Sequence, residues 1–141
     1  MAEEIIPPVK QSAPASNAGA GKKILIVEDD KDILFIFKTK FTGEGFSVVI
    51  AQDGEEGANV AEKEKPDLIL ADILLPKMDG LAMAEKIKKS NNTAKIIFLT
   101  NMKDTEYINN IKKSGEFDYL IKSDLRIEDI VDKVKIKLGL K

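Results

Sequence analysis

Short apolar runs alternate with amphipathic segments along the chain from residue 23 to its end. The apolar runs have the length of buried strands, and the segments between them carry apolar residues at helical spacing. The pattern predicts strands over residues 23–27, 46–51, 67–71, 95–99 and 117–121. It predicts helices beginning after Asp30 and over residues 54–65, 81–89, 104–113 and 127–138. Repeated β-then-α units indicate a parallel sheet with helices on both faces.

Polar and small residues mark several ends of these elements. Asp30 has the side chain of a helix cap. The apolar residues that recur at helical spacing after it are Ile33, Ile36, Phe37 and Phe41. Pro66 ends the second helix, and the Asp79–Gly80 pair predicts a turn that starts the third.

Residues 1–21 show no hydrophobic period and are rich in Pro, Ala, Ser and Gly. We interpret them as a flexible tail, native or added for expression, before a domain over residues 22–141. The segment from Gly19 to Lys22 faintly resembles a phosphate-binding loop. However, Lys23 stands where that loop needs Ser or Thr, and the segment precedes a strand instead of following one. We therefore favour a linker.

Composition indicates a soluble, globular protein of one domain. The chain has 141 residues, 43% hydrophobic and 33% charged, with a formal net charge of -2 and charges of both signs intermixed. This argues against nucleic-acid binding through a basic surface. No apolar run approaches the roughly 18 residues of a membrane helix, and the start does not resemble a signal peptide. We expect a cytoplasmic protein without membrane insertion.

The chain has no cysteine and no histidine. It therefore lacks disulfides, thiolate nucleophiles, the usual zinc ligands and an imidazole base. Any catalysis must depend on carboxylates, lysines and hydroxyls, with or without a hard metal ion.

Chemically reactive side chains follow four of the predicted strands. In open α/β sheets the carboxyl ends of the strands meet at the edge where ligands bind. The residues at these ends are Glu28, Asp29, Asp30, Asp72, Thr100 and Lys122. Acids, a hydroxyl and an ammonium group are thus expected at one edge.

Such a set suits phosphoryl transfer. Clustered carboxylates repel one another, and Mg²⁺, which prefers oxygen ligands, removes that repulsion. Glu28, Asp29 and Asp72 are the candidate metal site, and Asp72 is a candidate carboxylate nucleophile. Lys122 and Thr100 are placed to contact the phosphoryl oxygens, and this chemistry depends mainly on positioning and charge neutralisation.

The motifs together resemble the receiver domain of two-component response regulators, from about Lys22 to the end. They are residues 24–30, Asp72 followed by residues 75–80, residues 96–100 and residues 118–122. The resemblance implies an α/β, flavodoxin-like (βα)5 fold, a doubly wound parallel five-stranded sheet in the order 2-1-3-4-5.

The resemblance also assigns roles to residues. It implies that Asp72 is the phosphoacceptor, Thr100 the switch hydroxyl and Lys122 the phosphate contact. Tyr119 falls at the position of the switch aromatic, although a half-buried strand aromatic explains it nearly as well.

The implied cofactor is Mg²⁺. By the same resemblance, Asp29 and Asp72 bind it, the backbone carbonyl of Leu74 adds a ligand, and Glu28 acts through water or hydrogen bonds. Asp30 is better explained as a helix cap than as a ligand.

The implied partners are a sensor histidine kinase or phosphotransfer protein, which supplies the phosphoryl group, and a downstream output protein. Small phosphodonors also serve this family. The face formed by the fourth helix, fifth strand and fifth helix would change on phosphorylation. We expect a stand-alone receiver, unless the chain is a fragment, that assists only its own phosphorylation and dephosphorylation.

Two residues depart from the family pattern. Asn101 replaces the usual small residue after the switch hydroxyl, which predicts sluggish phosphorylation by small donors and a long-lived phosphoryl group. Ser123 replaces the usual proline after Lys122. Since a cis bond before a non-proline residue costs about 2.5–4 kcal/mol, we expect a trans bond there.

Other functions remain as alternatives. A pseudo-receiver would be an interaction module that takes no phosphate, and the complete acid, hydroxyl and lysine set argues against it. A flavin-binding electron carrier would need a loop rich in Ser, Thr and Gly where Glu28 and Asp29 stand. A phosphatase-type hydrolase would need a second Asp in the place of Leu74.

Overall fold

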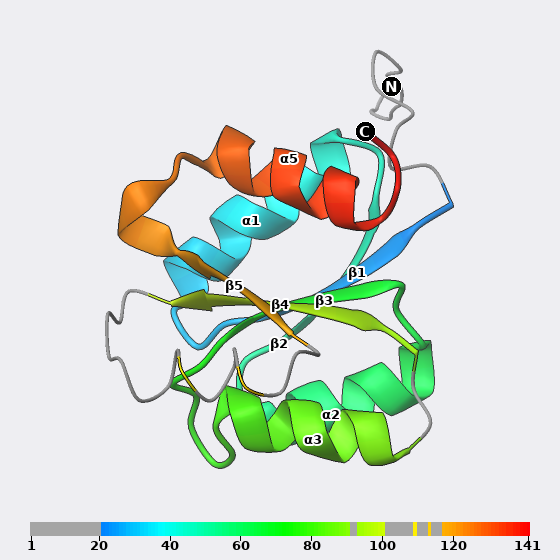
Figure 1. Ribbon diagram of the computed structural model, residues 1–141, viewed down its shortest axis with the longest axis vertical. Helices are drawn as coiled ribbons and strands as arrows, with labels where there is room; N and C mark the ends of the chain where they lie inside the picture. The colour runs from blue at the N-terminus through cyan, green and yellow to red at the C-terminus, as the bar shows by residue number, and fades with distance from the viewer. Residues whose placement is uncertain (1–20, 91–92, 101–108, 110–112, 114–116) are drawn as a thin grey trace, which may run out of the picture.

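The computed structural model describes residues 21–90, 93–100, 109, 113 and 117–141. Their centre is a parallel five-stranded sheet in the order β2-β1-β3-β4-β5, which confirms the predicted topology (Figure 1). The strands are β1 (Lys23–Val27), β2 (Ser47–Ala51), β3 (Leu68–Asp72), β4 (Lys95–Thr100) and β5 (Asp118–Ile121). Each strand lies within one residue of its predicted bounds.

Four α-helices and one short 3₁₀-helix lie within the described ranges. They are α1 (Lys31–Gly43), α2 (Gly54–Glu64), α3 (Gly80–Lys89), α5 (Ile127–Lys137) and the 3₁₀-helix η1 (Lys122–Asp124). The helix predicted over residues 104–113 lies outside the described residues, apart from residues 109 and 113. The sequence pattern did not predict η1.

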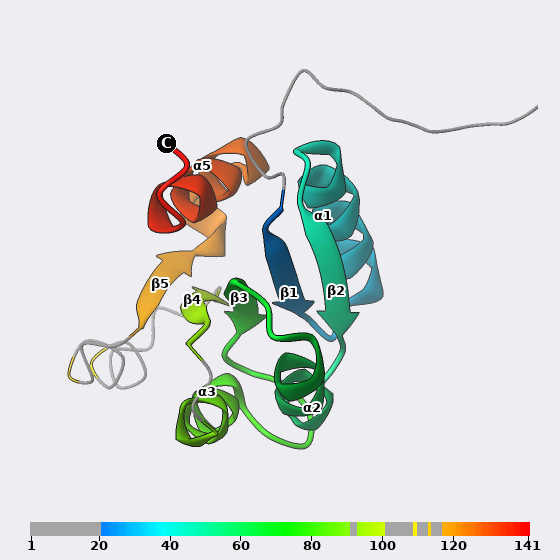
Figure 2. The same cartoon turned by 90° about the vertical axis from the view of Figure 1, so that its right-hand side faces the viewer.

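The helices cover the two faces of the sheet in pairs. α1 and α5 lie on one face, and α2 and α3 lie on the other (Figures 1 and 2). Each face has its own core cluster, one including Leu34, Phe41 and Val134, the other including Met83, Ile87 and Phe98. Burial on both faces explains why β1 and β3 are almost continuously apolar.

Aspartates start the first three helices next to the carboxyl ends of the strands. The Asp30 carboxylate accepts the N–H groups of Asp32 at 2.9 Å and Ile33 at 3.2 Å, which confirms Asp30 as a cap. Asp53 and Asp79 cap α2 and α3 in the same way. The helix starts are therefore fixed at the edge of the sheet where the candidate site lies.

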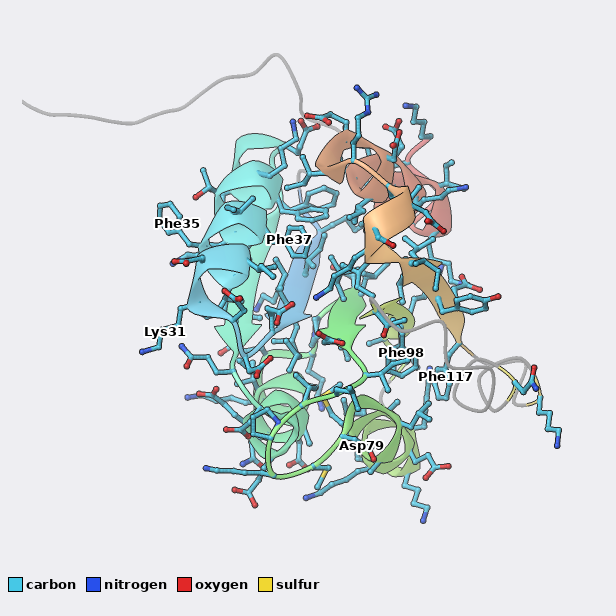
Figure 3. All side chains as sticks on the ribbon, turned by 90° about the vertical axis from the view of Figure 1, so that its left-hand side faces the viewer. Lys31, Phe35, Phe37, Asp79, Phe98 and Phe117 are labelled. Atoms are coloured by element: carbon cyan, nitrogen blue, oxygen red, sulfur yellow. The ribbon has the colours of Figure 1, made fainter. Side chains whose placement is uncertain are left out.

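The buried face of α1 differs by one residue from the predicted stripe. Phe37 and Phe41 are buried as expected, but Ile36 is 53% exposed and Leu34 takes a core position instead. Figure 3 shows Phe37 directed toward the sheet and Phe35 directed away from it. Spacing alone fitted Ile36 to the stripe, whereas the rotation of α1 on the sheet buries Leu34.

None of the helices in the described ranges is both long enough and apolar enough to cross a membrane.

Candidate functional site

The carboxyl ends of β1, β3, β4 and β5 bring the candidate residues together. The register aligns Asp72 of β3 with Leu99, and Thr100 of β4 with Ile121. Lys122 follows Ile121 directly, and Glu28 follows the last residue of β1. Side chains that are up to 94 positions apart in the sequence are therefore in contact at this edge.

Three carboxylates form the acidic part of the site. Glu28, Asp29 and Asp72 each offer an oxygen, and these oxygens all lie within 4.8 Å of one another. Glu28 is buried, with only 3% of its surface exposed, and its Oε2 accepts the Asp30 N–H at 3.1 Å. Asp30 turns its own carboxylate toward α1, so it stays outside this cluster, as predicted.

Lys122 connects two of the carboxylates. Its Nζ donates to Glu28 Oε1 at 2.8 Å and to Asp72 Oδ2 at 3.1 Å, and only 13% of its side chain is exposed. Residues 21–90, 93–100 and 117–141 contain no cis peptide bond, so the bond before Ser123 is trans, as predicted. The trans bond and η1 still let Lys122 reach the acids.

The electrostatics of the cluster leave it short of positive charge. Burial raises the pKa of Glu28, and the hydrogen bond from Lys122 offsets only part of that effect. Burial alone would lower the pKa of Lys122. The hydrogen bond to Glu28 and the charge of Asp72 outweigh it, so that this pKa lies above its usual 10.5. Lys122 is therefore cationic at neutral pH and faces three acidic groups.

A divalent cation with a preference for oxygen fits this donor set. One ammonium group against three clustered carboxylates leaves an excess of negative charge, and no histidine or cysteine is present to favour a softer metal. Mg²⁺ takes one or two carboxylates and completes its shell with water and phosphate oxygens. The donor set of Glu28, Asp29 and Asp72 therefore fits Mg²⁺.

The remaining predicted residues lie around the cluster. Thr100 is buried at the end of β4, with 1% of its surface exposed. Tyr119 is half-buried on β5, aligned with Phe98, and packs against the core on the α2–α3 side. Leu74 lies two residues after Asp72, and its side chain is 50% exposed. Asn101 lies outside the described residues.

The sequence interpretation did not predict the close backbone packing at two glycines of the site, although it placed Gly80 at the start of a helix. A Cβ at Gly54 would collide with the backbone carbonyl of Met78, and a Cβ at Gly80 would collide with that of Asp72. The Gly54 N–H donates to the Pro76 carbonyl at 3.3 Å. α2 and α3 thus hold the loop that leaves Asp72. The signal in the sequence is a repeated Asp–Gly pair at 53–54 and 79–80, where a helix cap is followed by a close backbone approach.

The same loop contains an unusual backbone conformation. Lys77 has a φ of 67°, in the left-handed region that residues other than glycine seldom adopt. Its Nζ lies 3.7 Å from the Asp53 carboxylate at the start of α2. This ion pair is a second contact between the start of α2 and the loop that joins β3 to α3.

Comparison with known proteins agrees with this geometry. The family model for the response regulator receiver domain matches residues 24–135. The alkaline phosphatase synthesis transcriptional regulatory protein PhoP of Bacillus subtilis is 34% identical over 112 residues. That match covers 79% of this chain and 42% of the relative, so the chain spans about two fifths of that regulator's length.

Solved structures show the same similarity. A response regulator receiver domain protein (CheY-like) from Methanospirillum hungatei is 36% identical with a TM-score of 0.78, covering 84% of this chain and 94% of that one. The response regulator protein TrrA of Thermotoga maritima, solved in complex with Mg²⁺ and BeF, is 32% identical with a TM-score of 0.72. The match covers 83% of this chain and 98% of the TrrA chain.

Proposed function

Because the chain belongs to the response regulator receiver domain family of two-component signalling, we propose that it accepts a phosphoryl group on Asp72 in a Mg²⁺-dependent reaction. One observation carries the proposal: Lys122 Nζ contacts both Glu28 and Asp72, while Asp29 completes a carboxylate cluster beside them. An acid nucleophile, a fixed ammonium group and a candidate cation site are the parts that transfer to a carboxylate requires.

In the proposed reaction an Oδ atom of Asp72 attacks phosphorus. The Asp72 O–P bond forms as the P–N bond of a donor phosphohistidine breaks, and the leaving imidazole keeps the electron pair of that bond. The attacking carboxylate carries no proton, so no base has to remove one. Lys122 contacts a phosphoryl oxygen and the Thr100 hydroxyl contacts another, and both then stabilise the charge on the transferred group.

The metal-binding roles follow from the acidic cluster. Asp29 and Asp72 would hold Mg²⁺ directly, with the backbone carbonyl of Leu74 as a further ligand and Glu28 acting through water or hydrogen bonds. When bound, Mg²⁺ supplies charge neutralisation for the carboxylates and for the incoming phosphoryl group. The similar TrrA structure, solved with Mg²⁺ and BeF, supports this assignment.

Phosphorylation would be read out at the β5–α5 side of the molecule. Thr100 is buried beside β5, in register with Ile121, and Tyr119 stands two residues earlier on the same strand. Movement of Thr100 toward a phosphoryl group on Asp72 would let Tyr119 reposition. The result is a shift between two conformations, biased by one new anionic group.

The proposed partners are a sensor histidine kinase or phosphotransfer protein as donor and an output protein as receiver of the signal. The chain itself would assist only its own phosphorylation and dephosphorylation. The transcriptional regulator PhoP is more than twice as long as the segment that matches this chain. We therefore do not assign the activity of the whole regulator to this chain.

The proposal is tested with a phosphoryl mimic. Wild type, Asp72→Asn and Asp30→Asn are titrated with beryllofluoride and Mg²⁺ while backbone amide shifts are followed by NMR. Asp30→Asn is the matched control, because asparagine also caps a helix and Asp30 lies outside the cluster. We expect wild type and Asp30→Asn to shift at Thr100 and Lys122, and Asp72→Asn to stay unchanged. A silent wild type would instead indicate a pseudo-receiver.

A further inference from the structure

A groove with an apolar wall and a basic rim lies between β5 and α5. It has a volume of about 420 Å³. Its wall includes Phe117, Tyr119, Leu120 and Ile136, and the last of these is 55% exposed. An exposed isoleucine beside two aromatic rings is costly to leave in water, so this groove offers free energy to an apolar occupant.

The rim of the groove carries two lysines. Lys137 pairs with Asp118 at 2.7 Å. Lys133 is exposed, and across the described parts of the chain no carboxylate pairs with it. An occupant with acidic side chains next to an apolar segment would therefore match both the wall and the rim.

The chain itself contains such a segment. Residues 3–9 read Glu-Glu-Ile-Ile-Pro-Pro-Val, and they are the main apolar cluster of the first 21 residues. The two consecutive prolines favour an extended polyproline II conformation, which docks on aromatic-lined grooves at low entropic cost. We propose that residues 3–9 dock in the β5–α5 groove of the same chain, with Glu3 and Glu4 toward Lys133.

The connection is long enough for this docking. Hydrogen bonds link Lys23 to Asp67 at 2.8 Å, Asp67 to Lys95 at 3.1 Å, and Lys95 to Lys137 on the groove at 2.9 Å. The start of β1 is thus about two strand spacings, roughly 10 Å, from β4. Figures 1 and 2 show the start of β1 and the C-terminal end of α5 at the same end of the molecule.

The residues between the docking segment and β1 form a linker of suitable length. Residues 10–21 are mostly small and polar, and a flexible chain of about a dozen residues has a root-mean-square length near 20 Å. β5 lies one further strand spacing beyond β4, so the linker exceeds the distance to the groove and holds residues 3–9 near it at a high effective concentration. Weak contacts suffice for docking under that condition.

This inference goes beyond phosphorylation and does not depend on it. The docked segment would cover the β5–α5 surface of the unmodified chain, so that any output protein using this surface would have to displace it. Docking is measured without metal or phosphodonor, so its failure leaves the role of Asp72 untouched.

The test uses the full chain and its lack of cysteine. A spin label on Ala2→Cys reports proximity through paramagnetic broadening of methyl signals. We expect Ile136 and Leu120 to lose most of their intensity. Ile36 serves as the internal control. Its exposed fraction of 53% is similar to that of Ile136, but it lies in a different apolar groove, between α1 and α5 near Lys122.

Matched substitutions separate docking from random encounters. Ile5→Ser with Ile6→Ser should restore the intensity at Ile136. Lys133→Glu should weaken the broadening, whereas Lys86→Glu, the same charge change at an exposed position on α3, should leave it unchanged. All these positions are in the tail or exposed, so the fold is retained.

Three results would overturn the proposal. The first is equal broadening before and after substitution of Ile5 and Ile6. The second is stronger broadening at Ile36 than at Ile136, which would place the segment in the other groove. The third is broadening that appears only when spin-labelled chains are mixed with unlabelled, isotope-enriched chains, which would assign the groove to a second copy.

Discussion

At the scale of single residues, the site depends on how Lys122 is shared. Its Nζ is bound to Glu28 and Asp72, which leaves Asp29 as the exposed member of the cluster, with no ion pair in the described ranges. Removing the charge of Asp72 relieves repulsion but also removes an ion pair. Removing the charge of Asp29 relieves repulsion alone. The two substitutions therefore differ in their effect on the metal-free protein.

Asp29→Asn should stabilise the metal-free protein by up to about 1 kcal/mol, since like charges about 4 Å apart repel by that amount in water. The free energy of unfolding should rise less in Asp72→Asn, because Lys122 loses an ion-pair partner. Urea denaturation in EDTA measures the free energy of unfolding, with Asp30→Asn as the control for charge. An Asp29→Asn protein no more stable than Asp30→Asn would contradict the crowding of the carboxylates.

Mg²⁺ should remove the stability advantage of Asp29→Asn over wild type. Mg²⁺ binds the folded state and raises the melting temperature of wild type by mass action, and it should do so far less for Asp29→Asn. Thermal unfolding with and without Mg²⁺ checks this. Equal shifts in the two proteins would place the metal elsewhere.

At the scale of elements, one contact between distant segments positions the site, and another joins two helices on the other face of the sheet. The start of α2 packs against the loop that leaves Asp72, where Gly54 meets the Met78 carbonyl. On the opposite face of the sheet, Lys135 of α5 donates to Glu44, which follows α1, at 2.6 Å. The first contact holds the candidate metal loop, and the second joins α5 to α1.

Gly54→Ala should destabilise the protein by about 1–3 kcal/mol, because the added methyl group collides with backbone atoms that cannot rotate away. Gly43→Ala is the matched control at the end of α1. Nothing lies within 4 Å of its added Cβ, and alanine favours the helix by up to about 1 kcal/mol. Denaturation curves compare the two proteins. A Gly54→Ala protein as stable as Gly43→Ala would contradict the close approach of α2 to the loop.

Glu44 provides a test that depends on pH. The hydrogen bond from Lys135 lowers the pKa of Glu44 in the folded protein below its ordinary 4.5. The pair therefore stabilises the fold above the ordinary pKa, and this stabilisation is lost as the pH falls through the lowered one. Glu44→Gln should cost about 0.5–1 kcal/mol at pH 7 and progressively less in acid below the ordinary value.

Glu64→Gln is the comparison for this pair. Glu64 binds Lys23 at 3.0 Å, but both side chains are about a third exposed, so solvent screens the interaction and the loss should be smaller. Urea unfolding of both variants across the acid range measures the difference. A Glu44→Gln deficit that grows as the pH falls would contradict the pairing.

At the scale of the whole molecule, the hydrophobic pattern predicted a parallel sheet and the edge where the site lies, and the resemblance to receiver domains predicted the order of the strands. Asp30, Asp72 and Lys122 were predictable because each stands at the end of a strand or helix with a clear hydrophobic pattern. The exposure of Ile36 was not, since it depends on how α1 rotates on the sheet. Gly54 was also missed, because its role is a contact with a loop more than twenty positions away.

The placement of Lys122 shows the same limit of local sequence reasoning. Without the usual proline, the sequence left its reach open, although it predicted the trans bond correctly. The structure shows η1 after β5 and contacts to two acids. Long-range contacts of this kind are set by packing across the sheet, and no local pattern encodes them.

The central claim is that Asp72 is the residue that receives the phosphoryl group. The direct measurement is peptide mass mapping after incubation with a small phosphodonor and Mg²⁺, with the acyl phosphate trapped by reduction before digestion. We predict one modified residue, Asp72, with the modification lost in EDTA and in Asp72→Asn. Modification of another residue, or of Asp72 to the same extent without metal, would contradict the account.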